Sequence, residues 1–216
     1  MLAADPRIQG FTTNPTLMHK AGLTRYAEFA QSLLERITEH PISFEVFADE
    51  PQEIRRQARL IASWAPNVYV KIPVTTTNGE SLAWLVRELS EGGVKVNVTA
   101  LFTVAQVELI TAAVKDGAPS CISVFAGRIA DAGVDPMPIM ARAVEIMAVA
   151  QDSELIWASP REILNLVQAD QVGCHIITVT HDLLKKLDCL GRDLERYSLD
   201  TVRMFHDDAV AAGFTL

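Results

Sequence analysis

Cysteine is scarce in this sequence, and the few cysteines present do not form a framework. Three occur among 216 residues, at positions 121, 174 and 189, and no Cys-x-x-Cys is found. The odd count and the spacing exclude a disulfide scaffold and a zinc ribbon. The five histidines show no His-x-x-x-His spacing and the carboxylates form no metal-binding box, so the sequence predicts no metal site.

Long apolar runs and clusters of positive charge are also absent. No apolar run approaches the ~18 residues of a membrane-spanning helix. Lys and Arg number 19 against 27 Asp and Glu, a net charge of −8, so we expect neither nucleic acid nor an anionic membrane as a partner. The first ten residues lack the basic segment and apolar stretch of an export signal, which makes the cytoplasm the expected location. A small phosphorylated substrate stays compatible with this acidity if cationic side chains form a local pocket.

What the sequence does contain is a regular alternation of short apolar runs and longer amphipathic segments. The runs are rich in Val, Ile and Phe, which is typical of buried parallel strands, and they lie at Ile8–Phe11, Ile42–Ala48, Val68–Val74, Val94–Val98, Cys121–Ala126, Leu155–Ala158 and Cys174–Val179. Helix starts are marked between them. Thr103 with Gln106 and Ser159 with Glu162 both fit a capping box. Asp135 followed by Pro136 fits a helix start too.

This alternation predicts one α/β domain over residues 1–216, with a tail helix at about 199–212 that follows no further strand. A closed (β/α)8 TIM barrel needs eight strands, and seven are found. Two explanations are open: a doubly wound open sheet, or a barrel whose first strand is missing from this chain. Doubly wound sheets usually carry a Gly-rich turn after the first strand, but Gly10 is followed by Phe-Thr-Thr-Asn-Pro and no Gly-x-Gly-x-x-Gly occurs. The barrel is therefore favoured.

Lys71 is the most unusual residue, because it lies inside the apolar run Val-Tyr-Val-Lys-Ile-Pro-Val. Burying an ammonium is costly, so such a lysine is rare. One interpretation is a lysine that reaches solvent at a strand end or pairs with a carboxylate. The other is a lysine whose pKa is lowered by desolvation, so that its neutral amine attacks a carbonyl and forms a Schiff base.

Polar residues on the neighbouring strands favour a site around Lys71. Glu45 lies inside Ser-Phe-Glu-Val-Phe, and alternation places it on the face opposite Phe44. Adjacent inward-facing strands would bring Glu45 near Lys71, either as part of a site or as a structural ion pair. Asn97 and Thr99 share one face of the next strand, where they could bind a substrate hydroxyl and a water or satisfy buried backbone groups.

Two arginine-containing segments follow later strands and suggest a phosphate site. Ser123, Phe125 and Arg128 lie in Ser-Val-Phe-Ala-Gly-Arg, and Ser159 and Arg161 lie in Ala-Ser-Pro-Arg. Barrel sites are built at the carboxyl ends of strands, and paired guanidinium groups suit a phosphate. Either arginine alone could equally form a surface ion pair, and Ser159 could serve as a helix cap. Thr12 to Asn14, before Pro15, fit a turn as well as a site role.

Several of these segments together resemble the transaldolase family, including its small branch of fructose-6-phosphate-aldolase-like proteins. The matching segments are Gly10–Pro15 (GFTTNP), Val70–Thr75 (VKIPVT), Asn97–Gln106 (NVTALFTVAQ), Ser123–Ile129 (SVFAGRI) and Ala158–Arg161 (ASPR). The resemblance runs from about residue 8 to the end of the chain. It implies a (β/α)8 barrel of the class I aldolase type, phosphorylated sugar substrates, a homo-oligomer, and a Schiff-base mechanism with no metal or organic cofactor.

The resemblance also implies residue roles. By motif position, Lys71 is similar to the Schiff-base lysine, and Glu45 and Thr99 to the pair that holds a catalytic water. Asn14 and Asn97 resemble contacts to the donor-sugar hydroxyls, and Glu45 and Asn97 favour the transaldolase branch. The residues that resemble the phosphate-binding set are Ser123, Arg128, Ser159 and Arg161. Thr12 and Phe125 are also expected in the substrate site.

The chain departs from the family pattern at its beginning. The family carries an aspartate on its first strand as a general acid/base, and Asp5 does not match that motif. The expected activity is transfer of a dihydroxyacetone unit between sugar phosphates. The alternatives are aldolase-type cleavage of fructose 6-phosphate, and a sugar-phosphate-binding relative without turnover.

Overall fold

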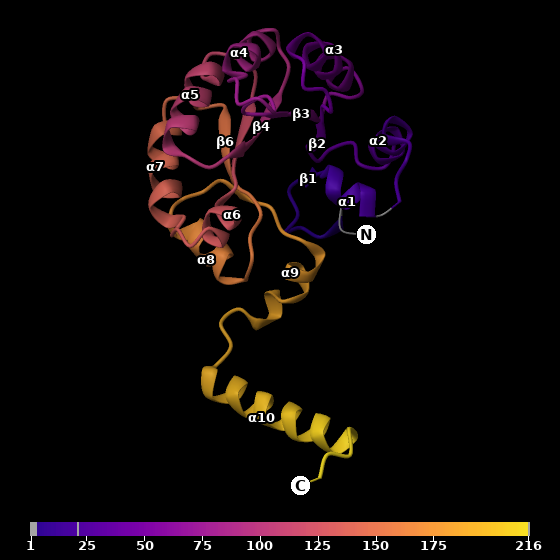
Figure 1. Cartoon of the computed structure of the whole chain (residues 1–216), viewed down its shortest axis with the longest axis vertical. Coiled ribbons are helices and arrows are strands. Elements are labelled where there is room, and N and C mark those ends of the chain that lie inside the picture. The colour runs from indigo at the N-terminus through magenta and orange to yellow at the C-terminus, as the bar shows by residue number, and fades with distance from the viewer. Residues whose placement is uncertain (1–3, 21, 216) are drawn as a thin grey trace. The chain divides into compact units, whose positions relative to one another are not determined.

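The computed structural model describes residues 4–20 and 22–215, and its contacts divide the chain into two compact units, Met1–Thr178 and Val179–Leu216. The first unit contains a seven-stranded sheet with helices along its outer side (Figure 1). Its strands are β1 (Phe11–Thr12), β2 (Ile42–Glu45), β3 (Val68–Pro73), β4 (Val96–Leu101), β5 (Ser120–Val124), β6 (Ser153–Trp157) and β7 (Ile176–Ile177). Its helices are α1 (Pro15–Lys20), α2 (Tyr26–Leu34), α3 (Pro51–Ala62), α4 (Ala83–Glu91), α5 (Val104–Val114), α6 (Ala126–Asp131), α7 (Met137–Met147) and α8 (Leu164–Gln171).

The strand order decides between the two folds that the sequence left open. Each strand pairs in parallel with the next strand in the sequence, from β1 through to β7. A doubly wound sheet would reverse its order at a switch point, whereas a barrel adds each strand beside the previous one. The described strands therefore form a TIM-barrel type of sheet with seven members, as predicted.

The two faces of the sheet have different roles, which β3 shows most clearly. Val68, Val70 and Ile72 are buried and belong to the main apolar core between the sheet and the helices. Tyr69 and Lys71 alternate with them and lie on the opposite face, which we call the inner face. The helices cover one side of the sheet, and the inner face carries both the charged Lys71 and a small apolar cluster around Cys121 and Ile156.

Two of the predicted helix starts have different outcomes. The capping box at Thr103 is confirmed, with Thr103 and Gln106 each satisfying the other's backbone N–H. The capping box at Ser159 is wrong, because α8 begins only at Leu164. The Asn165 side chain accepts from the backbone N–H groups of Arg161 and Glu162 instead, at 2.7 and 3.2 Å.

The second unit contains α9 (His181–Lys185), a short 3-10 helix (Leu187–Cys189) and α10 (Leu194–Ala211). The tail helix begins at Leu194 rather than Leu199, because the Asp193 side chain accepts a hydrogen bond from the Arg196 N–H at 2.8 Å and caps the helix there. All 18 residues of α10 are described, and none of them is buried. None of the described helices is both long and apolar enough to cross a bilayer. That the whole chain forms one domain stays a prediction.

Candidate active site

The ladder between β2 and β3 brings together the two charged residues that the sequence singled out. Glu45 and Lys71 are register partners, so both side chains leave the same face of the sheet. The Lys71 ammonium donates to Glu45 Oε1 at 2.9 Å. Only 11% of the lysine side chain and 7% of the glutamate side chain are exposed. The predicted proximity is thus confirmed, and the pair is largely withdrawn from water.

Three further groups fix this pair, and the sequence had identified none of them as partners. The Lys71 ammonium also donates to the backbone carbonyl of Thr13 at 2.8 Å. Glu45 Oε2 accepts from the Thr13 hydroxyl at 2.7 Å and from the Tyr26 hydroxyl at 3.1 Å. The Tyr26 oxygen in turn accepts from the Glu45 backbone N–H at 2.8 Å. The carboxylate is therefore held from the chain segments at β1, α2 and β3.

The protonation state of Tyr26 follows from its surroundings. Burial, and then the charge of the Glu45 carboxylate, raise the pKa of Tyr26 well above its ordinary value of about 10. The phenol therefore keeps its proton at every ordinary pH. It acts towards Glu45 as a permanent hydrogen-bond donor.

A buried chain of polar side chains runs beside the charged pair. Asn97, the register partner of Lys71 on β4, is 1% exposed. Its amide donates to the Ser43 hydroxyl at 3.0 Å, and its carbonyl oxygen accepts from the Ser123 hydroxyl at 2.8 Å. Ser43, which the sequence reasoning missed, lies two residues before Glu45 and could have been found from strand alternation. The chain links β2, β4 and β5 across the inner face.

Thr99 lies two residues before the end of β4, on the same face as Asn97 and beside Pro73 of β3. The next residue, Ala100, has a φ of 64°, and the register to β5 shifts between Val98 and Leu101. A residue with a side chain rarely adopts this left-handed backbone, and such strain concentrates at functional sites. The irregularity changes the direction of the last residues of β4, at the carboxyl edge of the sheet.

The two arginine-containing segments are in direct backbone contact. The N–H of Gly127 donates to the carbonyl of Ala158 at 3.2 Å. A Cβ placed on Gly127 would lie 1.5 Å from the Ser159 carbonyl oxygen, so only glycine fits there. Ser159 itself has a φ of 60°. The segments that carry Arg128 and Arg161 are therefore joined at this point.

Both arginines already have partners within these segments. Arg161 forms a forked pair with Asp131, in which its Nε lies 2.9 and 3.1 Å from the two carboxylate oxygens. This pairing, together with the more distant charge of Arg128, holds the pKa of Asp131 below its usual range. The Arg128 guanidinium lies over the Phe125 ring at 5.6 Å, and Phe125 packs against Phe102. Asp131 is a charged neighbour of the phosphate candidates that the sequence did not reveal.

The first strand segment shows the turn that its sequence predicted. Asn14 Oδ1 accepts from the backbone N–H of Thr16 at 2.9 Å, and α1 begins at Pro15. Thr12 is exposed at the end of β1. Asn14 and Thr12 therefore lie at the carboxyl edge of the sheet, where the other candidates end.

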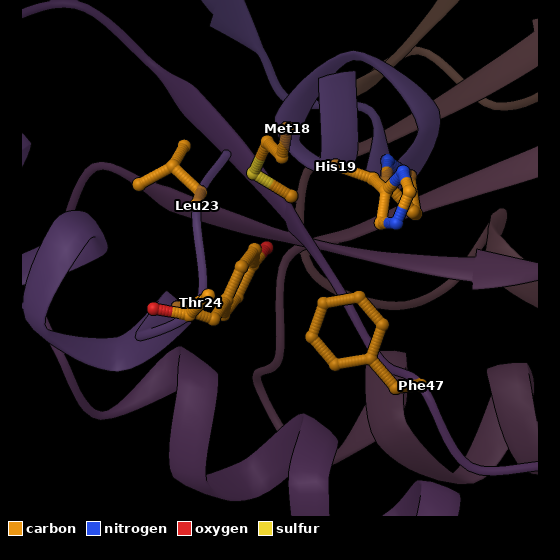
Figure 2. A pocket seen from close by; sticks show the side chains of 7 residues that line it. Met18, His19, Leu23, Thr24 and Phe47 are labelled. Atoms are coloured by element: carbon orange, nitrogen blue, oxygen red, sulfur yellow. The ribbon is translucent and has the colours of Figure 1, made fainter. Parts of the chain in front are cut away.

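Tyr26 also lines a small cavity. Its volume is about 140 Å³. Figure 2 shows Met18, His19, Leu23, Thr24 and Phe47 surrounding the hollow. Tyr26 and Pro15 complete the lining. Over residues 4–20 and 22–215, no group of three His, Cys, Asp or Glu side chains could hold a metal ion.

Fold and site together define a TIM-barrel type of α/β protein with a largely buried lysine–carboxylate pair on its inner face. Comparison with known proteins then gives the particular family. The model of the Transaldolase/Fructose-6-phosphate aldolase family matches residues 1–216, and the chain belongs to this family.

Curated relatives agree with this family assignment, and one solved structure agrees with the fold. A "Probable transaldolase" of Dehalococcoides mccartyi is 39% identical over 181 residues, which are 83% of this chain and 80% of that protein. A "Probable transaldolase 2" of Listeria monocytogenes is 37% identical over 181 residues, 83% of this chain and 78% of that protein. The crystal structure of inosine 5′ monophosphate dehydrogenase from Legionella pneumophila superimposes with a TM-score of 0.55 at 12% identity. That alignment covers 82% of this chain and 58% of the dehydrogenase, and the likeness concerns the fold alone.

Proposed function

We propose that this chain transfers a dihydroxyacetone unit between sugar phosphates through a Schiff base on Lys71. The observation that carries the proposal is the largely buried Lys71 ammonium, 2.9 Å from the Glu45 carboxylate on the inner face of the sheet. The family membership supports phosphorylated sugars as the substrate class.

The pair supplies the first proton transfer of such a reaction. Glu45 accepts a proton from the Lys71 ammonium, and the neutral amine attacks the carbonyl carbon of a ketose phosphate. The carbinolamine loses water and leaves an iminium ion. Glu45 gives its proton to this departing water and is ionised again, so it can remove the hydroxyl proton of the fourth carbon. The bond between the third and fourth carbons then breaks, its electron pair passes into the iminium to form an enamine, and an aldose phosphate departs. Attack of the enamine on a second aldose phosphate, followed by hydrolysis, completes the transfer and returns the amine.

The remaining candidates receive roles that agree with their positions. We assign Thr99 with Glu45 to a catalytic water, and Asn14 and Asn97 to the hydroxyls of the donor. We assign phosphate binding to Arg128, Arg161, Ser123 and Ser159. Thr12 and Phe125 line the substrate site. The forked Arg161–Asp131 pair supports this assignment, since the same guanidinium geometry fits a phosphate.

Borohydride reduction tests the proposal directly. Incubation with fructose 6-phosphate and borohydride, followed by peptide mass mapping, should place a reduced sugar adduct on Lys71. Lys71→Met should remove the adduct, and Lys95→Met is the matched control because Lys95 lies over the Tyr69 ring and donates to the Pro66 carbonyl instead. Absence of any adduct on the folded full chain would refute the proposal.

The same preparation separates transfer from cleavage. If the enamine is passed to an acceptor, product should form only when an aldose phosphate is added. Release of free dihydroxyacetone without an acceptor would identify aldolase-type cleavage. Calorimetric binding of sugar phosphate without adduct or product would identify a binding protein.

We also propose that the chain works as a homo-oligomer in the cytoplasm. Apolar side chains of α10 are more than 45% exposed in this chain, which supports contact with a second copy: Leu194, Leu199, Val202, Met204, Phe205 and Val210. The three cysteines are free thiols, as is usual in a reducing compartment. Sedimentation of the wild type and of Phe205→Glu tests the oligomer.

A further inference from the structure

We infer that Tyr26 is a positioning residue that holds the Glu45 carboxylate in line with the Lys71 amine. The inference rests on the proposed function, because it gives Tyr26 a purpose in the same proton transfer. It concerns a residue outside every sequence segment that pointed to the site.

The Tyr26 hydroxyl contacts Glu45 twice. Its oxygen accepts from the Glu45 backbone N–H at 2.8 Å, and its hydrogen is directed to Glu45 Oε2 at 3.1 Å. One hydroxyl thus bridges the main chain and the side chain of the same residue. This closed arrangement fixes the carboxylate relative to the end of β2.

The Tyr26 ring is held in place by aromatic contacts. It packs edge-to-face on Phe47 and Phe44, with ring centres 4.6 and 6.1 Å apart, and is tilted on Trp64 at 6.3 Å. Aromatic contacts of this kind favour one ring position. The hydroxyl is therefore presented to Glu45 by a rigid support.

The Thr13 hydroxyl cannot replace Tyr26 as a donor to Glu45. The Thr13 hydroxyl has one hydrogen and two acceptors in reach, Glu45 Oε2 at 2.7 Å and the Ser43 carbonyl at 2.8 Å. The Tyr26 hydroxyl has the Glu45 carboxylate as its nearest acceptor, at 3.1 Å, and the next possible acceptor is the Thr13 hydroxyl at 3.5 Å. The Tyr26 hydroxyl therefore donates to Glu45 Oε2, whereas the Thr13 hydrogen has two competing acceptors.

The two hydroxyls determine which carboxylate oxygen of Glu45 is available to accept a proton from Lys71. With Oε2 held by the two hydroxyls, Oε1 faces the Lys71 ammonium at 2.9 Å. The titratable groups in hydrogen-bond contact with this carboxylate are Lys71 from β3 and Tyr26 from α2. Donors to an ionised carboxylate stabilise its charged form, so loss of the Tyr26 hydroxyl should make Glu45 easier to protonate.

The test compares Tyr26→Phe with Tyr69→Phe. The Tyr69 side chain also lies on the inner face and is half-buried, but it has no hydrogen bond to Glu45. The first readout needs no substrate: the titration of the Glu45 carboxyl carbon is followed by NMR in ¹³C-glutamate-labelled protein, with the signal assigned by its loss in Glu45→Gln. We expect the midpoint to rise by roughly one pH unit in Tyr26→Phe and to stay unchanged in Tyr69→Phe.

The second readout is the pH profile of borohydride trapping. In Tyr26→Phe the acid limb should move to higher pH by the same amount, and the maximal trapping rate should fall about tenfold while the KM for the ketose changes little. If Tyr26→Phe does not fold, 3-fluorotyrosine at position 26 replaces it. Its more acidic phenol is a stronger donor, so the Glu45 midpoint should then fall.

The outcomes separate the two proposals. An unchanged Glu45 titration in folded Tyr26→Phe, or an equal shift in Tyr69→Phe, would overturn the role of Tyr26. No sugar adduct on wild-type Lys71, together with a shifted Glu45 titration in Tyr26→Phe, would leave the positioning of Glu45 standing and refute the Schiff-base function.

Discussion

Glu45 and Lys71 are paired residue for residue in the parallel ladder of β2 and β3, and their charged groups meet 2.9 Å apart. The distance is set by the sheet rather than by a flexible loop. A carboxylate at this position can stabilise the ammonium or accept its proton, and the same contact therefore serves the resting state and the first chemical step.

Removing the charge of Glu45 should slow catalysis more than it harms folding. Glu45→Gln keeps an oxygen and an amide near Lys71 but cannot take up the proton, so we expect the rate of adduct formation to fall by about 10²–10⁴. The control is Glu154→Gln on β6, a carboxylate that is exposed. Rapid trapping with borohydride measures both, and an undiminished rate in Glu45→Gln would exclude Glu45 as the proton acceptor.

The contact between Gly127 and Ser159 gives a second prediction. Gly127→Ala would drive a methyl group to 1.5 Å from the Ser159 carbonyl oxygen, so one of the two segments must move. We expect a stability loss of about 1–3 kcal/mol and a higher KM for phosphorylated substrates. Gly92→Ala is the control, because its methyl group would meet the Glu88 carbonyl only at 3.1 Å. Equal effects of the two substitutions in urea unfolding and in KM would contradict the prediction.

The phosphate role of Arg161 predicts a selective loss of affinity. Arg161→Ala should raise the KM for fructose 6-phosphate about 10- to 100-fold, since hydrogen bonds between charged groups contribute about 1.5–3 kcal/mol each. Trapping of unphosphorylated dihydroxyacetone should stay at the wild-type rate. Arg142→Ala, which removes an exposed i, i+3 ion pair on α7, should change neither value. Equal losses with both ketoses would argue against phosphate binding at Arg161.

The Arg161–Asp131 pair should stabilise the fold at neutral pH and not in acid. Asp131 has its pKa lowered from the ordinary 3.8, chiefly by hydrogen bonds from Arg161. The pKa of Asp131 is lower in the folded protein than in the unfolded chain. The pair therefore stabilises the fold at pH values above the unfolded-state pKa, and this stabilisation is lost as the pH falls through the folded-state pKa. Unfolding midpoints of the wild type and Asp131→Asn should therefore differ at neutral pH and converge below about pH 4. Convergence at high pH instead would contradict this linkage.

The buried chain through Asn97 predicts a stability effect. Asn97→Ala would leave the hydroxyls of Ser43 and Ser123 without the partner each now has at 3.0 and 2.8 Å. An unmade buried hydrogen bond costs about 1–3 kcal/mol, and we expect a loss in that range or somewhat above it. Urea denaturation measures it, with Asn78→Ala in an exposed turn as the control. A loss within experimental scatter would show that the cavity takes up water in place of the amide.

The sequence predicted the strands from their apolar runs, the parallel arrangement from the alternation of these runs with amphipathic helices, and the meeting of Glu45 with Lys71 from the alternation of faces along adjacent strands. A buried charge in an apolar run is visible without coordinates. So is the capping box at Thr103, whose partners are three residues apart.

Contacts between distant segments could not be predicted in the same way. Tyr26 lies 19 residues from Glu45 in the chain, and Asp131 lies 30 residues from Arg161. Nothing in the neighbourhood of either residue indicates its partner. The error at Ser159 has a related cause: the pattern of a capping box was present, but the close approach of Gly127 holds Ser159 in a left-handed backbone that no N-cap adopts.

The pairing of β2 with β3 also favours the correct register of the two strands. Successive side chains of a strand point to opposite faces, so a slip of one residue in either strand would thrust Glu45 or Lys71 among the apolar side chains that the helices cover. The other member of the pair would then lie on the inner face without its partner of opposite charge. The same two residues that are proposed to do the chemistry thus penalise a one-residue slip between β2 and β3, so the correctly paired sheet is also the one in which the reactive groups are aligned.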